Sequence, residues 1–127
     1  QMVFYKAILM CLLDYTLAFT VLGLGGIFKG KVKSDVTAIF LGALLATFLR
    51  YVCHFFSGVI LWGSYAEWFF SQEGFAFGAS VLAKYSGMLL SVIYSLVYNG
   101  LYMVPEIIIT SVVTPLVYKA LKSAKVL

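Results

Sequence analysis

The sequence is poor in charge. Nine Lys and Arg and five Asp and Glu make up 11% of its 127 residues, against the roughly 25% that is usual in soluble domains. Hydrophobic residues make up 63%, so too few polar side chains remain to cover a surface in water. These proportions exclude an ordinary soluble domain, a disordered chain and a coiled coil. They predict one all-α integral membrane domain over residues 1–127, folded as a helical bundle.

Cysteine and histidine are equally scarce. Cys11 and Cys53 lie in apolar runs without CxxC or Cys/His spacing, and His54 is the one histidine, which excludes a disulfide scaffold and a typical metal cluster. The sequence also has no HExxH motif, phosphate-binding loop or nucleophile elbow. We therefore expect no enzyme, no metal and no cofactor. The net charge of +4 comes from two loop clusters, so it indicates a lipid bilayer as partner and no nucleic acid.

Charged residues delimit the long apolar tracts, which cover residues 7–28, 36–66 and 85–118. One basic cluster, at residues 29–33, follows the first tract, and another, at residues 119–125, follows the third. Between the first cluster and the second tract, Ser34 and Asp35 offer a helix N-cap. Each tract is as long as a membrane span or longer, since a span needs about 20 apolar residues.

The positive-inside rule places both basic clusters on the cytoplasmic side, which requires an even number of crossings between them. The sequence therefore predicts three spans, at residues 3–28, 35–61 and 99–121, with the C-terminus in the cytoplasm. The third span is expected to begin at Asn99-Gly100, and Pro105 marks the same boundary. Residues 76–98 then form an outer-face helix that packs on the bundle or dips partway into it. Four ordinary spans with the C-terminus outside remain the alternative.

Four ionisable residues interrupt the spans: Asp14, Arg50, His54 and Glu106. Such groups cost several kcal/mol to insert into a membrane, so each is a candidate for function. Each of them could instead have a purely structural role. Asp14 could form an intramembrane brace with Arg50, His54 could donate one interhelical hydrogen bond, and Glu106, after Pro105, could be a first-turn acid that matches the helix dipole. We take Arg50 to be structural, holding carbonyl groups or a carboxylate.

Polar residues from the different tracts lie at a similar depth. At 1.5 Å per residue, Asp14 lies about 22 Å from Lys29, His54 about 28 Å from Asp35, and Asn99 about 30 Å from the next lysine. These depths predict one polar pocket that opens on the outer side.

The spacing of the residues supports such a pocket. His54, Gly58 and Trp62 are four residues apart, so they advance by about 40° at each step and share one helix face. Asp14 and Tyr15 add a carboxylate and a phenol. The third tract adds hydroxyl and amide groups from Tyr94, Tyr98, Asn99 and Tyr102. An anion among aromatic rings suits a flat organic cation. Trp62 could instead belong to an interfacial aromatic belt, as we expect for Trp68.

Two strings resemble a known family. The strings RYVCHFFSGVILWGSYA at residues 50–66 and YSLVYNGLYMVPE at residues 94–106 are similar to the thiamin-specific substrate-binding (S) subunit of energy-coupling-factor (ECF) vitamin transporters. That family has six spans, so the resemblance implies that this chain covers its C-terminal half to two-thirds and begins near the fourth span.

The resemblance implies a thiamin-binding protein in the cell membrane of a bacterium, with a transmembrane coupling subunit and two ATPase subunits as partners. It carries ligand-binding positions to Asp14, Tyr15, His54, Gly58, Trp62, Tyr94 and Asn99. Two departures are visible. The family's carboxylate is usually Glu, which is one methylene longer than Asp14, and the segment between Trp62 and Tyr94 is longer than usual. An S subunit for another vitamin or organic cation, and an accessory structural membrane protein, remain the alternatives.

Overall fold

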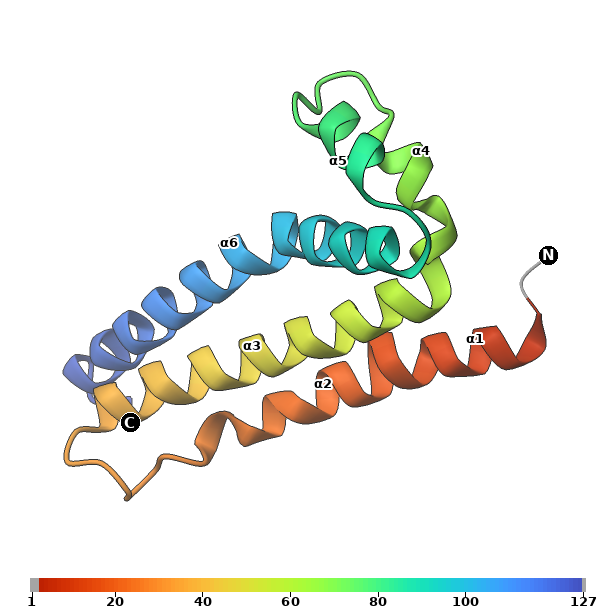
Figure 1. The fold of residues 1–127 in the computed structure, drawn as a ribbon. Coiled ribbons are helices and arrows are strands. Elements are labelled where there is room, and N and C mark those ends of the chain that lie inside the picture. Colours follow the sequence, from red (N-terminus) through yellow and green to blue (C-terminus); the bar gives the residue numbers. More distant parts are fainter. Residues whose placement is uncertain (1–2, 127) are drawn as a thin grey trace.

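The computed structural model describes residues 3–126 and contains helices but no strand within that range. Six α-helices follow one another along the described residues (Figure 1). Their bounds are α1 (Phe4–Met10), α2 (Ala18–Thr20), α3 (Asp35–Trp62), α4 (Ala66–Phe70), α5 (Gly78–Lys84) and α6 (Gly87–Ser123). A π-helical segment (Cys11–Leu17) joins α1 to α2, and 3₁₀ turns cover Val21–Gly26 and Gly63–Tyr65.

Three helical stretches of the described chain are long and apolar enough to cross a membrane: Phe4–Gly26, Asp35–Phe70 and Gly87–Ser123. The predicted all-α membrane bundle is therefore confirmed, with three such stretches and not four. We call Phe4–Gly26 the first helical segment. It ends two residues before the expected boundary, whereas α3 begins as predicted, with the Ser34 hydroxyl oxygen accepting the Thr37 N–H at 3.5 Å.

The third tract folds differently from the prediction. In place of an outer helix over residues 76–98 and a span from residue 99, α5 has only seven residues, and α6 runs unbroken from Gly87 to Ser123. Asn99 does not break the helix because its side chain finds partners there, with Nδ2 donating to the Ser95 carbonyl one turn earlier at 2.9 Å and to the His54 carbonyl of α3 at 3.2 Å. Pro105 lies in the interior of α6, where it removes one backbone donor, and the α6 ribbon bends between its teal and blue parts (Figure 1).

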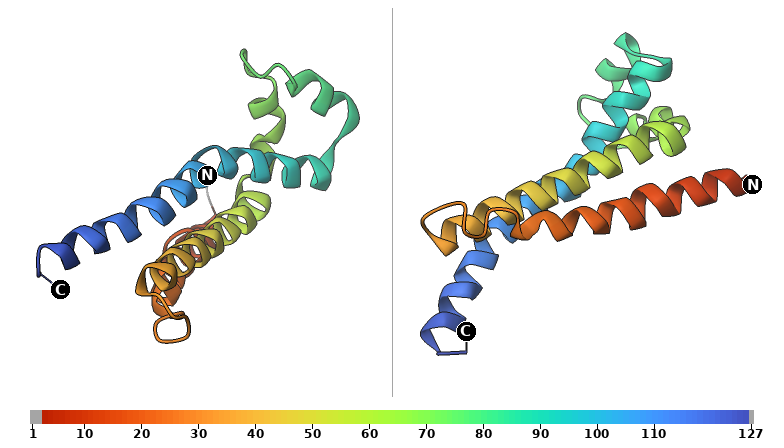
Figure 2. Two further views of the ribbon diagram at one scale, coloured as in Figure 1. Left: turned by 90° about the vertical axis from the view of Figure 1, so that its left-hand side faces the viewer. Right: turned by 90° about the horizontal axis from the view of Figure 1, so that it is seen from below.

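Helix α3 packs against both other long helices, with the first helical segment along one side and α6 along another (Figures 1 and 2). Two glycines meet where the first helical segment packs on α3. A Cβ atom on Gly42 would lie 1.8 Å from the carbonyl oxygen of Gly25, so a side chain at residue 42 would separate the two backbones.

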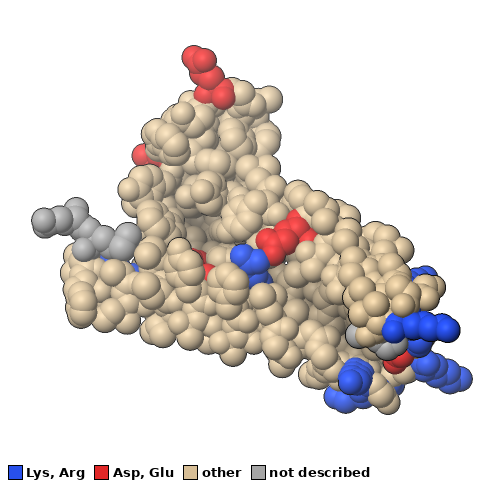
Figure 3. Space-filling model, turned by 180° about the vertical axis from the view of Figure 1, so that it is seen from behind, with Lys and Arg blue, Asp and Glu red and all other residues tan. Residues whose placement is uncertain are grey.

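One end of the bundle, which we call the cap, holds a cluster of buried apolar side chains. The cluster joins α4 to the first turns of α6 through Ala66, Phe69, Phe70, Leu90 and Tyr94. The prediction that residues 76–98 pack on the bundle therefore holds for their second half, which forms the first turns of α6. Basic side chains gather at the opposite end of the molecule, and between the two ends a small group of basic and acidic atoms lies near the middle of an otherwise uncharged face (Figure 3). Large apolar side chains along the three stretches are exposed, as lipid contact requires.

Candidate ligand-binding site

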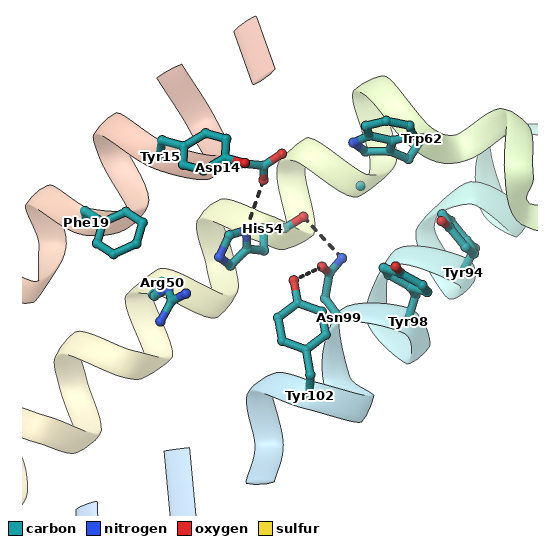
Figure 4. A pocket seen from close by; sticks show the side chains of 11 residues that line it. Asp14, Tyr15, Phe19, Arg50, His54, Trp62, Tyr94, Tyr98, Asn99 and Tyr102 are labelled. Atoms are coloured by element: carbon teal, nitrogen blue, oxygen red, sulfur yellow. Dashed lines mark hydrogen bonds and ion pairs between the residues drawn. The ribbon is translucent and has the colours of Figure 1, made fainter. Parts of the chain in front are cut away.

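A cavity of about 390 Å³ lies between the first helical segment, α3 and α6 (Figure 4). Its lining residues are Asp14, Tyr15, Phe19, Arg50, His54, Gly58, Trp62, Tyr94, Tyr98, Asn99 and Tyr102. All seven residues that the sequence singled out for ligand binding are among them, although they come from three separate tracts. The similar depths calculated for Asp14, His54 and Asn99 therefore correspond to one place in the structure.

Asp14 carries the cavity's carboxylate and faces α3 from the π-helical segment. Its Oδ2 accepts a hydrogen bond from the Ser57 hydroxyl at 2.7 Å, and its Oδ1 lies 2.9 Å from His54 Nδ1. The side chain is 20% exposed. A carboxylate has about four acceptor sites, so these two partners leave acceptor capacity for a third. Arg50 pairs with Glu106 and not with Asp14, which shows that the Asp14–Arg50 brace considered from the sequence is not the arrangement here.

The Asp14 contact indicates which nitrogen of the His54 ring carries a proton. Because an ionised carboxylate only accepts, Nδ1 is the atom that carries the proton in this contact. In the neutral ring Nε2 is then an acceptor. This atom is buried and has no hydrogen-bond partner among residues 3–126. His54 therefore makes the interhelical bond anticipated from the sequence and still has one unused polar atom.

Asn99 ties α6 to α3 at the side of the cavity. Its Nδ2 donates to the His54 carbonyl at 3.2 Å, and its Oδ1 accepts from the Tyr102 hydroxyl at 2.6 Å (Figure 4). Gly58 leaves the space that this network fills. A Cβ on Gly58 would lie 2.2 Å from Ser95 Oγ and 2.8 Å from Asn99 Nδ2. Gly58 thus allows α6 to approach α3 closely beside the ligand cavity.

Aromatic rings form much of the cavity wall. Tyr94 and Tyr98 are stacked with ring centroids 5.5 Å apart, and Tyr94 also meets Phe69 of the cap at 5.3 Å. Trp62, at the end of α3, lies above them in Figure 4, and Tyr15 lies across the cavity on the first helical segment. Trp68 does not line the cavity and is 62% exposed, in keeping with the belt position expected for it.

Tyr98 and Tyr102, which the sequence places in the polar pocket together with Tyr94, also line the cavity. Two further lining residues, Phe19 and Arg50, are not predicted for the pocket from the sequence. Helical spacing holds a signal for Phe19, because it is four residues after Tyr15 and so shares the face of a predicted residue.

Arg50, for which the sequence predicts a structural role, also lines the cavity. It forms an ion pair with Glu106 of α6, and its guanidinium carbon lies 5.1 Å from the centre of the Phe19 ring. The expectation that Arg50 holds a carboxylate is confirmed. The first-turn role suggested for Glu106 is wrong, because α6 begins at Gly87 and places Glu106 in its interior.

These groups suit a flat organic cation. The cavity offers one partly satisfied carboxylate, stacked aromatic faces and a few fixed polar atoms, which together provide charge pairing, cation–π contact and orientation. No group of three or more His, Cys, Asp or Glu side chains able to hold a metal ion occurs in the described part of the chain.

Comparisons with known proteins point in the same direction. The chain is 36% identical to the "Thiamine transporter ThiT" of Bacillus subtilis (strain 168), over 90% of this chain and 56% of that protein. It is 40% identical to the "Thiamine transporter ThiT" of Lacticaseibacillus paracasei over 43% of this chain and 32% of that protein. The chain thus spans about half the length, or less, of these curated relatives.

No solved structure gives a significant match to the chain. The family model described as "Thiamine transporter protein (Thia_YuaJ)" matches residues 1–126, which is almost the whole sequence. With that coverage, three apolar helices and a cavity built from the predicted residues, the chain belongs to the Thia_YuaJ thiamine transporter family.

Proposed function

We propose that this chain binds thiamin as part of the substrate-binding subunit of an ECF-type vitamin transporter. The observation that carries the proposal is the Asp14 carboxylate, which lies on an aromatic cavity in a chain of a thiamine transporter family. Thiamin combines a cationic thiazolium ring with a neutral aminopyrimidine ring, so it needs a counter-charge, flat apolar walls and a few polar contacts.

Each group has a role in this proposal. Asp14 neutralises the cationic ring, and Tyr15, Trp62 and Tyr94 provide aromatic walls. His54 and Asn99 orient the ligand through hydrogen bonds, with the unpartnered Nε2 of His54 as the available acceptor. Gly58 contributes by its lack of a side chain.

Tryptophan fluorescence can test ligand binding because Trp62 lines the cavity while Trp68 is exposed elsewhere. We expect thiamin to quench the emission of the full-length protein in detergent. Trp68→Ala should leave this quenching intact, and Trp62→Ala should abolish most of it and weaken binding.

Asp14→Asn tests the counter-charge. The change keeps the shape of the side chain but removes its charge, so we expect thiamin affinity to fall by about 10- to 100-fold, as for the loss of one charge-assisted interaction. Glu73→Gln, an equal change of charge at an exposed position, is the matched control. Unchanged affinity in Asp14→Asn would reject this site. If another cationic vitamin bound while thiamin did not, the protein would be an S subunit for that ligand. If no solute bound, an accessory structural role would be favoured.

We also propose that residues 29–33 and the C-terminus face the cytoplasm of a bacterial cell. Lys33, Lys119 and Lys122 border one common depression, so the two basic clusters lie together at one end, as the positive-inside rule requires. The proposal predicts that, with Cys11 and Cys53 replaced by Ala, an impermeant maleimide labels Ser80→Cys in intact cells. Ser123→Cys should react only after the cells are opened. The reverse pattern would invert the orientation.

The proposed partners are a transmembrane coupling subunit and two ATPases, which would supply the work of transport. The support is the resemblance to S subunits, together with the absence of any phosphate-binding loop from this sequence. Co-purification of these three subunits with a tagged full-length protein would test the assembly. Recovery of the tagged protein alone from a thiamin-transporting membrane would count against it.

A further inference from the structure

Arg50 places a positive charge in a cavity whose proposed ligand is a cation. It lines the same cavity as Asp14, and it is four residues before His54, the residue that contacts the Asp14 carboxylate. Residues four apart on a helix are neighbours on one face, so Arg50 lies one turn of α3 from the His54 ring that contacts the carboxylate. A free guanidinium there would repel a cationic ring and compete with it for Asp14.

In the structure the Arg50 guanidinium is paired with Glu106. Its Oε1 pairs with Nη1 of Arg50 across the α3–α6 interface, and the Phe19 ring lies 5.1 Å from the guanidinium carbon. Among residues 3–126, Glu106 is the one carboxylate that pairs with the Arg50 side chain. The Nε atom of Arg50 is buried and has no hydrogen-bond partner among these residues. Asp14 is thereby left to its two partners on α3, the Ser57 hydroxyl and the His54 ring.

We propose that Glu106 is a positioning residue for cation specificity, which acts through Arg50. By holding the guanidinium away from Asp14 it keeps that carboxylate available as the counter-charge of the ligand. The inference rests on the proposed binding of a cationic ligand in this cavity. It differs from a simple helix brace because it assigns opposite effects to the two members of one ion pair.

The opposite effects provide the test. In Glu106→Gln the guanidinium loses its partner and turns to Asp14, so affinity for thiamin should fall at least tenfold. A neutral analogue, in which a thiophene replaces the thiazolium ring, should keep its affinity. In Arg50→Met the competing cation is gone, so thiamin should bind at least as well as to the unaltered protein. The double variant Arg50→Met/Glu106→Gln should likewise bind thiamin normally.

A helix brace predicts something else. Breaking the pair from either side would then weaken thiamin and the neutral analogue alike, and the double variant would not recover. That outcome, or unchanged thiamin affinity in Glu106→Gln, would overturn the proposal. Glu67→Gln removes an exposed acid from α4 and is the matched control for charge. If Glu106→Gln did not fold, Arg50→Met and the double variant would decide, since thiamin binding below that of the unaltered protein in both would equally reject the idea.

The test also separates this inference from the proposed function. Failure of the unaltered protein to bind thiamin, or indifference to Asp14→Asn, would reject the function itself. Normal thiamin binding that depends on Asp14 but not on Glu106 would reject only the role of Glu106.

Discussion

At the scale of single residues, Gly58 shows how the site depends on an absent side chain. A methyl group there would lie 2.2 Å from Ser95 Oγ, which is itself held by donation to the Phe55 carbonyl at 2.6 Å. Gly58→Ala must therefore break that bond or push α6 away. We expect the free energy of unfolding to fall by about 1–3 kcal/mol and thiamin binding to weaken, because Asn99 moves with α6.

Thermal unfolding and ligand titration in the same detergent would measure both effects. Gly26→Ala is the control, since a Cβ there would meet nothing within 4 Å. Equal stability of the two variants would mean that α6 lies farther from α3 than the structure places it.

Much of the site could be predicted at this scale, because a polar residue in an apolar span is rare enough to stand out. Asp14 and His54 were found on that ground, and both line the cavity. Phe19 gave no such signal, since a Phe in a span is as well suited to lipid as to a cavity wall. The partner of Arg50 also escaped prediction. It depends on how α6 packs across α3, which the sequence of either helix alone does not specify.

At the scale of elements, the boundaries of the first two spans followed from charge and capping, but those of the third did not. Asn favours turns because its side chain can bond to the nearby backbone, and Pro favours them because its φ is fixed and it has no backbone N–H. In α6 the Asn99 side chain finds local partners on Ser95 and Tyr102 and a tertiary partner in the His54 carbonyl of α3, so its preference for a turn is overridden. The contact with His54 joins tracts more than 40 residues apart.

The glycine crossing between the first helical segment and α3 yields a prediction at this scale. A Cβ on Gly42 would lie 1.8 Å from the Gly25 carbonyl oxygen, and a backbone atom cannot rotate away. Gly42→Ala should therefore lower the free energy of unfolding by about 3 kcal/mol. Gly42 is about 18 Å along α3 from His54, and Asp14 keeps its own bonds to α3, so thiamin affinity of the folded protein should stay within about threefold.

Differential scanning fluorimetry and thiamin titration of Gly42→Ala would check this, with Gly23→Ala as the control because a Cβ there has open space. A loss of affinity as large as that of Asp14→Asn would contradict the prediction. It would show that the first helical segment shifts as one rigid rod and that the distant crossing sets the cavity.

At the scale of the whole molecule, side-chain burial is uneven. The cap holds a closed apolar cluster, whereas the three long stretches expose large apolar side chains, which suits a solvent of lipid tails. Truncating a cap residue leaves a cavity inside protein, but truncating a lipid-facing residue lets lipid or detergent fill the space. Stability should therefore depend on where an apolar side chain lies more than on its size.

Two phenylalanines test this expectation because they are the same residue type but differ in burial. Phe70 is 2% exposed in the cap, and Phe48 on α3 is 50% exposed. Phe70→Ala should lower the free energy of unfolding by about 3–5 kcal/mol, and Phe48→Ala by less than about 1 kcal/mol. Phe70→Ala should also weaken thiamin binding, since the cap cluster includes Tyr94 of the cavity wall. Thermal unfolding with and without thiamin measures both quantities, and equal losses from the two variants would contradict this division between cap and spans.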